Sequence, residues 1–351
     1  MLTARGGAIN GMPLKAAGLF FLAVMAQAAN YSAQKLAVDG IEIIRLSDAA
    51  HRIEVSICPS VGNIAYDLRV NGKPVLMSPS GGLAEWKAKP AQAGIPFLGP
   101  WANRMDPDSF WANGKRYLLN PDAGVLRRDA NGLAIHGLLL FASAWQVIKL
   151  NAGDDAAEMV SLVEFWRHPE WMSQFPFAHT IEMTYRLSNG TLEVRTTIHN
   201  ESRDPMPLLI GFHPWYQIPN VPRDDWKVHV PVREHYTLSS KLVPTGEKKP
   251  SDLPDPVPLA GRQLDDVFGG VNSADEFWVE GRGQRVSVRF GPKFPIAVVY
   301  APQDRNVVCF EPMTGITNAF NLAHAGLYKD LQSIAPGGTW TESFWIRPSG
   351  F

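Results

Sequence analysis

The chain has 351 residues, of which 45% are hydrophobic and 19% are charged, and its formal net charge is −1. This length suffices for one large domain or two ordinary ones with a substantial core. A near-neutral charge without a basic run argues against a nucleic-acid partner. The aromatic content of 10%, together with 28 Pro and 30 Gly, favours many short strands and frequent turns over long helices.

The N-terminus has the pattern of an export signal. Arg5 and Lys15 precede a short apolar run, residues 16–25, and the small residues Ala26 and Ala28 follow it. The run suits the core of a signal peptide and is too short to span a bilayer. A signal peptide over residues 1–28 predicts a periplasmic or secreted protein with no membrane association after its removal. An extension with a chance apolar patch is the alternative.

From residue 41 onward, apolar and polar residues alternate with a period near two, which is typical of half-buried strands. The clearest pair is 180–187 and 191–200, joined by a Ser-Asn-Gly turn, and its alternation leaves one face in solvent. Similar strands continue on both sides of the proline-rich stretch 243–258, which we expect to be a surface loop. The sequence predicts an all-β fold, in which residues 29–351 form one large antiparallel β-sandwich domain with few or no long helices.

Two apolar runs each deliver a titratable side chain directly before a proline. Residues 307–310 lead to Glu311, and Pro312 is expected to end the strand pairing there. Burial raises the pKa of a carboxyl group toward neutrality, which suits a general base, although a surface ion pair is the alternative for this residue alone. Residues 208–212 lead to His213. A histidine facing a carboxylate can hold an acid and a base together near pH 7.

Further polar residues interrupt apolar, Gly- and Pro-rich surroundings. Asn103 and Arg104 follow a Gly-Pro turn and offer donors that suit sugar hydroxyls or carboxylates, or backbone carbonyls. His136 lies in an apolar run and is either a core histidine with a satisfied partner or a binding residue. Asp265 and Asp266 form an acidic pair with too few neighbouring oxygen ligands for a calcium loop.

The two cysteines, Cys58 and Cys309, both have apolar neighbours. A bridge between them is permitted in an oxidising compartment, but the sequence does not give their separation. No CxxC or HxxxH spacing accompanies them, so we expect no metal site. The chain also lacks a G-x-S-x-G elbow, a P-loop, a GxGxxG turn after a strand and an HExxH helix.

Taken in chain order, these stretches resemble the aldose 1-epimerase (mutarotase) family. The family's signatures are an Asn-Arg pair, a His-Gly-Gly segment, a strand ending in His before an aromatic residue, an Asp-x-x-Phe stretch and a Glu-Pro-x-Thr-Gly block. They correspond here to Asn103-Arg104, His136-Gly137, Phe212-His213-Pro214-Trp215, Asp265-Asp266-Val267-Phe268 and the block from Glu311 to Asn321. The similarity covers roughly residues 41–346. One departure is Leu138, which stands where the family has its second glycine.

The resemblance implies a galactose mutarotase-like supersandwich that interconverts the α and β anomers of a free aldohexose without a metal or organic cofactor. Carried over by position, Glu311 is the base and His213 the acid. Arg104, Asn103, His136 and Asp265 bind the sugar, with Asp266 as a rival to Asp265. The expected partner is a small monosaccharide, and the expected assembly is a monomer or weak homodimer.

Three rival functions remain open from the sequence, and one of them, a polysaccharide lyase of related fold, lacks an evident Tyr- and Arg-rich basic cleft. A hexose-6-phosphate 1-epimerase on the same scaffold predicts an additional basic cluster near the sugar, for which Arg127 and Arg128 are the candidates. A non-catalytic carbohydrate-binding β-sandwich needs the aromatic residues and Arg104 but has no use for the pair of Glu311 and His213.

Overall fold

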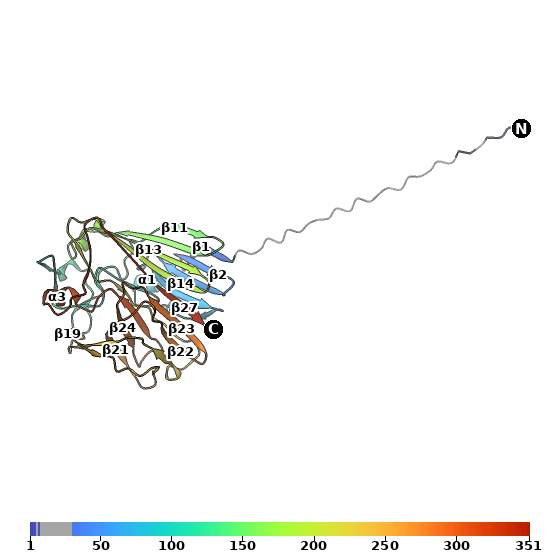
Figure 1. Cartoon of the computed structure of the whole chain (residues 1–351). Helices are drawn as coiled ribbons and strands as arrows, with labels where there is room; N and C mark the ends of the chain where they lie inside the picture. Colours follow the sequence, from blue (N-terminus) through green and yellow to red (C-terminus); the bar gives the residue numbers. More distant parts are fainter. Residues whose placement is uncertain (5, 8–29) are drawn as a thin grey trace.

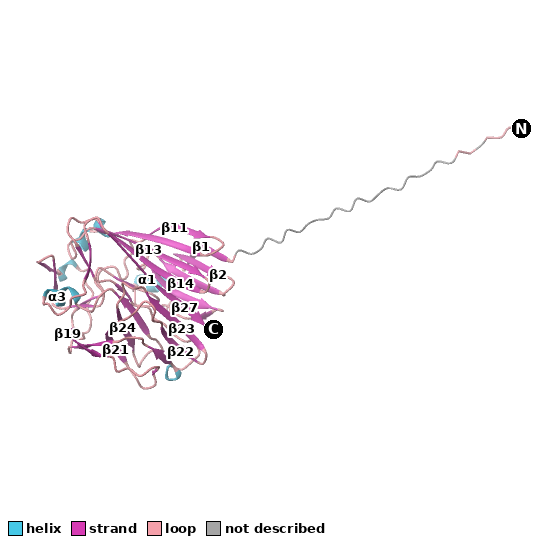
Figure 2. Cartoon of the chain, viewed as in Figure 1, coloured by secondary structure: helices cyan, strands magenta, loops and turns pink. Residues whose placement is uncertain are grey.

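The computed structural model describes residues 1–4, 6–7 and 30–351. Apart from residues 1–4 and 6–7, the predicted signal peptide lies outside the described residues. The regular structure of the described chain consists mostly of antiparallel strands (Figure 2), which confirms the predicted fold class. Its helices are short: α1 (Leu83–Ala88), α2 (Pro169–Met172), α3 (Ala319–His324) and the 3-10 turns η1 (Pro121–Ala123), η2 (Phe165–Arg167) and η3 (Arg223–Asp225). Within the described residues, no helix has the length and apolarity needed to cross a membrane.

The largest sheet of the described chain has nine strands and lies at the centre of the fold (Figure 1). Its order is β11 (Gln146–Ala152), β12 (Ala157–Glu164), β13 (His179–Ser188), β14 (Thr191–Asn200), β27 (Thr339–Ser349), β23 (Gln284–Phe290), β22 (Phe277–Gly281), β17 (Lys227–His229) and β20 (Val257–Pro258). The last strand of the chain, β27, lies between β14 and β23 and so joins the two halves of this sheet.

The predicted hairpin 180–200 is confirmed as β13 and β14. Asn189 and Gly190 form its turn with φ angles of 48° and 71°. Two successive positive φ angles match the twist of the flanking strands, and Asn-Gly adopts them at little cost. Residues of β14 alternate between buried and partly exposed positions, as expected for a strand with one face on the core.

Two smaller sheets cover the two halves of the nine-stranded sheet. The first contains β1 (Tyr31–Val38), β2 (Ile41–Asp48), β3 (Ile53–Cys58), β4 (Ile64–Val70) and β5 (Lys73–Pro74), and it lies against β11, β12 and β13. The second contains β19 (Pro244–Pro250), β18 (Glu234–Leu238), β21 (Leu264–Gly269), β24 (Ile296–Ala301), β25 (Cys309–Met313), β16 (Gly211–Phe212) and β6 (Phe97–Leu98).

Aromatic side chains join the second covering sheet to the large sheet. Phe310 of β25 lies 5.6 Å from Phe277 of β22, and Phe212 of β16 lies 4.8 Å from Phe344 of β27, measured between ring centroids. Each of these rings is essentially inaccessible to solvent. Buried aromatic pairs of this kind bury 150–250 Å² per ring and so dominate the packing energy of a core. The sheet that carries the candidate site is therefore packed on a buried aromatic core.

Three two-stranded ribbons complete the fold. They pair β7 (Arg104–Met105) with β10 (Ala134–Ile135), β8 (Ser109–Ala112) with β9 (Lys115–Leu118), and β15 (Met206–Leu208) with β26 (Gln332–Ile334). The first ribbon contains Arg104, and two further candidate site residues flank its strands: Asn103 precedes β7 and His136 follows β10.

Two sequence predictions about proline are wrong. The stretch 243–258 contains strands β19 and β20, and both stand at the ends of their sheets. An edge strand tolerates proline because its missing N–H can face outward. Pro312 lies inside β25, which continues to Met313. The neighbouring strand β16 pairs with β25 only at Gly211 and Met313, so this side of β25 has little ladder pairing for Pro312 to disrupt.

Candidate active site

One face of the second covering sheet carries the polar residues of the site. Glu311 in β25 lies opposite Val298 in β24, and Asp265 in β21 lies opposite Tyr300, also in β24. Because residues two apart in a strand share a face, this register places the two carboxyl groups and the phenol ring on the same side.

His213 reaches the same face from the short strand β16. Its ring atom Nε2 lies 3.3 Å from Oε1 of Glu311. The imidazole is stacked on the indole of Trp215, with centroids 4.7 Å apart and planes 7° from parallel, which fixes its orientation. Two residues earlier, Gly211 allows the close approach of the strands, since a Cβ there would lie 2.8 Å from the carbonyl oxygen of Pro312.

The ribbon of β7 and β10 delivers Arg104, held by two oxygen acceptors. Its Nε donates to Asp129 Oδ2 at 2.7 Å, and its Nη1 donates to Asn103 Oδ1 at 3.1 Å. The side chains of Arg104 and Asp129 are only 14% and 8% exposed. Asn103 adopts a φ of 60°, a conformation that asparagine tolerates better than most residues. The guanidinium is thereby presented to the cavity in a fixed orientation.

His136 follows β10 with a φ of 61°, and its backbone N–H donates to the carbonyl of Asn103 at 3.0 Å. Its ring meets that of His213 edge-on, at 5.6 Å between centroids. Leu138, the departure from the family pattern, is 9% exposed and joins the hydrophobic core, and it does not line the cavity. The substitution therefore does not alter the walls of the site directly.

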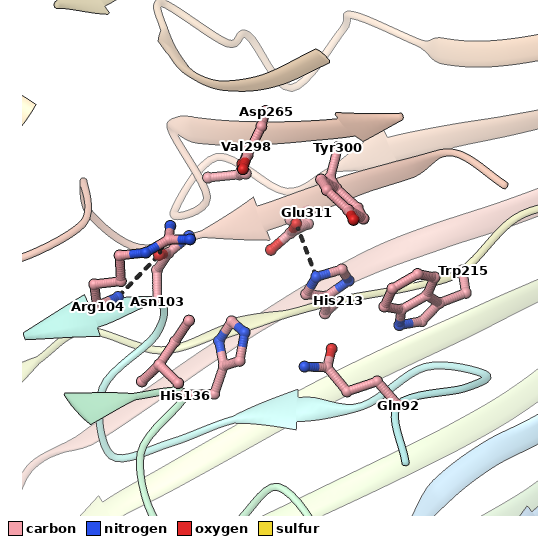
Figure 3. Close-up of a pocket in the computed structure, with 11 residues that line it drawn as sticks. Gln92, Asn103, Arg104, His136, His213, Trp215, Asp265, Val298, Tyr300 and Glu311 are labelled. Carbon is pink, nitrogen blue, oxygen red and sulfur yellow. Dashed lines mark hydrogen bonds and ion pairs between the residues drawn. The ribbon is translucent and has the colours of Figure 1, made fainter. Parts of the chain in front are cut away.

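These side chains surround a cavity of about 220 Å³ (Figure 3). That volume lies below the ~300–1,000 Å³ usual for drug-sized ligands and suits one small, compact molecule. In Figure 3, Trp215 and Gln92 lie on the side of the Glu311–His213 pair away from Arg104 and Asn103. The lining residues are Gln92, Asn103, Arg104, Ile135, His136, His213, Trp215, Asp265, Val298, Tyr300 and Glu311.

Several buried polar atoms of the cavity have no hydrogen-bond partner among the described residues. They are Oε2 of Glu311, Nδ1 of His213, Nδ1 of His136 and Oε1 of Gln92. Buried polar groups in folded proteins are almost always paired, and an orphan costs about 1–3 kcal/mol. Unpaired groups converging on one cavity therefore indicate a ligand with several hydroxyl or other polar groups.

Burial also changes the proton affinities of the site. It raises the pKa of Glu311 well above its usual value, an effect that the neighbouring Asp265 carboxylate reinforces and Arg104 opposes. Burial lowers the pKa of His213 to about 3, and the charge of Arg104 acts in the same direction. Burial lowers the pKa of His136 well below its usual value, and burial raises that of Asp265. The site thus favours the uncharged forms of the Glu311–His213 pair.

The structure brings together all six residues singled out in the sequence: Glu311, His213, Arg104, Asn103, His136 and Asp265. It also separates the two neighbouring aspartates. Asp265 lines the cavity, whereas Asp266 accepts a 3.0 Å hydrogen bond from His235. Of the two aromatic residues after Pro214, Trp215 lines the cavity and Tyr216 is fully buried elsewhere, near Phe310.

Sequence reasoning missed Asp129, Gln92 and Tyr300. Asp129 and Gln92 lie in irregular segments where no pattern predicts the direction of a side chain. Tyr300 lies on the same face as Val298 in an alternating strand, so knowledge of the register would have revealed it. The described residues contain no cluster of three or more His, Cys, Asp or Glu arranged to hold a metal ion. Cys58 and Cys309 are both free and buried.

Comparisons with known proteins agree with this architecture. The model of the family described as aldose 1-epimerase matches residues 43–347. A galactose mutarotase-like protein from Clostridium acetobutylicum has a similar structure, with a TM-score of 0.81 and 22% identity over 92% of this chain and 99% of that one. A galactose 1-epimerase from Lactobacillus acidophilus NCFM has a TM-score of 0.69 and 12% identity over 91% and 99% of the two chains. The uncharacterised protein YphB of Escherichia coli K12 is 22% identical over 71% of this chain and 82% of its own.

Proposed function

The chain belongs to the aldose 1-epimerase family, and on that premise we propose that it interconverts the α and β anomers of a free aldohexose. The observation that carries this proposal is the buried contact between His213 and Glu311, with 3.3 Å between Nε2 and Oε1, inside a cavity the size of one small ligand. A histidine and a carboxylate at this distance can remove one proton and supply another in the same step.

In the proposed reaction, Glu311 removes the proton of the C1 hydroxyl while His213 donates a proton to the ring oxygen. The bond between C1 and the ring oxygen breaks, and the sugar becomes an open-chain aldehyde. Rotation about the C1–C2 bond presents the other face of the carbonyl. Glu311 then returns its proton to the carbonyl oxygen while His213 takes the proton back, and the ring closes as the other anomer. Arg104, Asn103, His136 and Asp265 hold the remaining hydroxyls.

Glu311 and His213 together hold one proton in each state of this cycle. Ring opening converts a carboxylate and an imidazolium into a carboxylic acid and a neutral imidazole, and ring closure reverses the change. The total charge of the pair is zero in both states, so the buried cavity never has to accept net charge. The pKa shifts of Glu311 and His213 both favour the neutral pair, which is the state that accompanies the open-chain sugar.

A free sugar fits the cavity better than a sugar phosphate. Arg128 donates two hydrogen bonds to Asp108, at 3.1 and 2.7 Å, and Arg127 lies over the ring of Phe141. Neither arginine lines the cavity. The cavity itself contains two carboxyl groups and one guanidinium that is already paired with Asp129. Such a lining gives a phosphate dianion no unpaired cation to bind.

The test is the Glu311→Gln variant, which keeps the shape of the side chain and removes its basicity. We expect the enzymatic rate of mutarotation, followed polarimetrically on a panel of free aldoses including glucose and galactose, to fall by about 10²–10⁴-fold. The fold should persist. Burial raises the pKa of Glu311, so above its unfolded-state pKa the folded protein binds more protons than the unfolded chain, and stability falls with rising pH. The variant removes this penalty and should be at least as stable at pH 7.

The matched control is Glu342→Gln, at a buried glutamate of β27 whose oxygens accept hydrogen bonds from the backbone of Ser343 and Lys293. This control should reduce stability and leave kcat/KM unchanged. Near-normal mutarotation by Glu311→Gln would remove that residue from the mechanism. Absence of turnover by the wild type on free aldoses, combined with sugar binding that survives Glu311→Gln, would instead indicate a non-catalytic sugar-binding protein.

A further inference from the structure

A small cavity opens on the outer face of the nine-stranded sheet, where β14, β27, β23 and β22 lie side by side. It has a volume of about 140 Å³ and shares no lining residue with the candidate active site. The proposed function makes no use of it. Its lining residues are Thr191, Glu276, Ser287, Arg289, Trp345 and Arg347.

The cavity faces away from the core and from the candidate active site. Val288 of β23 and Ile346 of β27 are inaccessible to solvent, whereas the residues that follow them, Arg289 and Arg347, are exposed. Successive side chains of a strand point to opposite faces of the sheet, so both arginines project from the solvent side. The sheet and the core beneath it therefore separate this cavity from the second covering sheet, which carries the candidate active site.

The register of β23 and β27 brings the lining side chains together. Arg289 lies opposite Trp345, and Ser287 lies opposite Arg347. The two arginines therefore occupy diagonal positions on neighbouring strands, a separation that long side chains can bridge. Thr191 begins β14, which pairs with β27 on its other side, and it adds a second hydroxyl group. Two guanidinium groups and two hydroxyl groups thus surround the cavity.

Two arginines of β23 share this face of the sheet and differ in how their charge is paired. Arg285 lies over the ring of Trp278, 4.2 Å from its centroid, and forms an ion pair with Glu280. Arg289 lies over the ring of Trp345 at 5.0 Å. In the part of the chain that the structure describes, no carboxylate lies within 4 Å of Arg289. Stacking therefore holds its guanidinium in place, and its forked donors remain available to a ligand.

The other donors of the cavity are unpaired in the same way. Among the described residues, no carboxylate lies within 4 Å of Arg347, although Glu276 lines the same cavity. Ser287 is only 8% exposed, and neither its hydroxyl nor that of Thr191 forms a side-chain hydrogen bond within the described chain. Two guanidinium groups and one carboxylate leave the lining with an excess of one positive charge. The cavity therefore favours an anion.

We propose that this cavity is a second binding site and that it takes a phosphate group, either as the free ion or in a phosphate ester. Arg289 and Arg347 would each direct their N–H donors at phosphate oxygens, and Ser287 and Thr191 would donate from their hydroxyls. Arginine forks bind phosphate and carboxylate groups alike. The donors come from three neighbouring strands and not from one plane, which suits a tetrahedral anion better than a planar carboxylate. The proposal is independent of the mutarotase function.

The experiment measures binding of inorganic phosphate to the purified protein by isothermal titration calorimetry, in a phosphate-free buffer whose ionic strength is held constant with NaCl. We expect a Kd on the order of 1 mM for the wild type, since both arginines are exposed to solvent. Arg289→Gln and Arg347→Gln should each weaken binding by roughly tenfold or more, because each removes charge-assisted hydrogen bonds.

Arg285→Gln is the matched control, since it removes an arginine of the same strand and face that lies outside the cavity. Its Kd should stay within about twofold of the wild-type value, because its charge is already paired with Glu280. Thermal unfolding of the three variants shows that each is folded. Mutarotation of free aldoses by the same proteins tests the proposed function separately.

Phosphate binding that is absent, or that Arg289→Gln and Arg347→Gln leave unchanged, overturns the proposal. An equal loss in Arg285→Gln also overturns it, because the binding then reflects the charge of the whole face. Displacement of phosphate by glucose would place the ion in the candidate active site and overturn it as well. Acetate that binds as tightly as phosphate overturns the assignment to a tetrahedral anion. Glycerol 3-phosphate distinguishes the two sources: an affinity above that of the free ion indicates a phosphate ester, and an affinity no higher indicates the ion itself.

Discussion

Two buried histidines of this protein have similar environments and different partners. His179, at the start of β13, is 1% exposed and stacks on Phe165 with centroids 4.2 Å apart. His213, after β16, is 7% exposed and stacks on Trp215. Burial lowers the pKa of the first to about 4 and that of the second to about 3. A shifted pKa therefore does not distinguish a functional histidine from a structural one in this chain.

The hydrogen-bond partners do distinguish them. Nδ1 of His179 pairs with the backbone carbonyl of Phe177 at 2.7 Å, in surroundings of phenylalanine rings. Nδ1 of His213 has no hydrogen-bond partner in the described part of the chain, and its Nε2 faces the buried carboxyl of Glu311, which lines the same cavity. The first arrangement is satisfied without a ligand. In the second arrangement, polar atoms face a cavity, and His213 and Glu311 can exchange a proton. We therefore place the chemistry there.

The largest expected difference between the two histidines is in reaction rate. His213→Gln removes the proposed acid and should reduce the rate of mutarotation by about 10²–10⁴-fold. His179→Gln, remote from the cavity lining, should leave kcat/KM within about twofold of wild type, because a residue that contacts neither the reacting atoms nor the residues that hold them supplies no transition-state binding. Polarimetry on a reactive aldose measures both. Equal losses in the two variants would mean that His213 acts only through the fold.

His179 and His213 should make similar contributions to the pH dependence of the free energy of unfolding. The folded-state pKa of His179 is about 4, below the ordinary value of 6.5. Between these values the unfolded chain holds a proton that the folded chain lacks, so stability falls as the pH falls, by up to about 1.4 kcal/mol per pH unit for one group. His179→Gln should remove this contribution, and His213→Gln should remove a similar one that extends to about pH 3.

Urea unfolding of the wild type and of both variants between pH 7 and pH 4 tests this. The exposed His199→Gln variant is the control for the loss of one histidine. If His179→Gln retains the full wild-type dependence of unfolding free energy on pH in that interval, then burial does not hold His179 neutral in the wild-type protein. A dependence lost in His179→Gln and retained in His213→Gln would show that the two buried environments differ more than their geometry indicates.

Alternation and turn chemistry were sufficient to predict the fold class, because residues such as those of β13 and β14 bury one face and turn at Asn-Gly. The six cavity residues were predicted because they occur along the chain in the same order as the family's signatures. In addition, a polar residue that follows an apolar strand is recognisable in the sequence. Asp129 was not predictable, since its contact with Arg104 spans 25 positions and depends on the pairing of β7 with β10. The position of Pro312 inside β25 likewise depends on how short its neighbour β16 is.

The smallest expected effect concerns Asp129, one of the site residues that the sequence did not reveal. Asp129 holds Nε of Arg104 in a pair whose side chains are 14% and 8% exposed, whereas Asp108 holds Arg128 in a pair whose side chains are 38% and 35% exposed. Exposed pairs contribute about 0–1 kcal/mol, and removing one partner of a buried pair costs more. Asp129→Asn should lower kcat/KM on the reactive aldose roughly tenfold, mainly through KM, because Arg104 loses the acceptor that orients it for the sugar.

Asp108→Asn is the matched control, since it breaks a bidentate arginine pair outside the cavity, and it should leave both constants unchanged. Thermal unfolding of the two variants separates loss of structure from loss of orientation. A fall in kcat with KM unchanged in Asp129→Asn would assign Arg104 to the transition state and not to sugar binding. Equal kinetics in Asp129→Asn and Asp108→Asn would mean that Asn103 Oδ1, 3.1 Å from Nη1, positions Arg104 by itself.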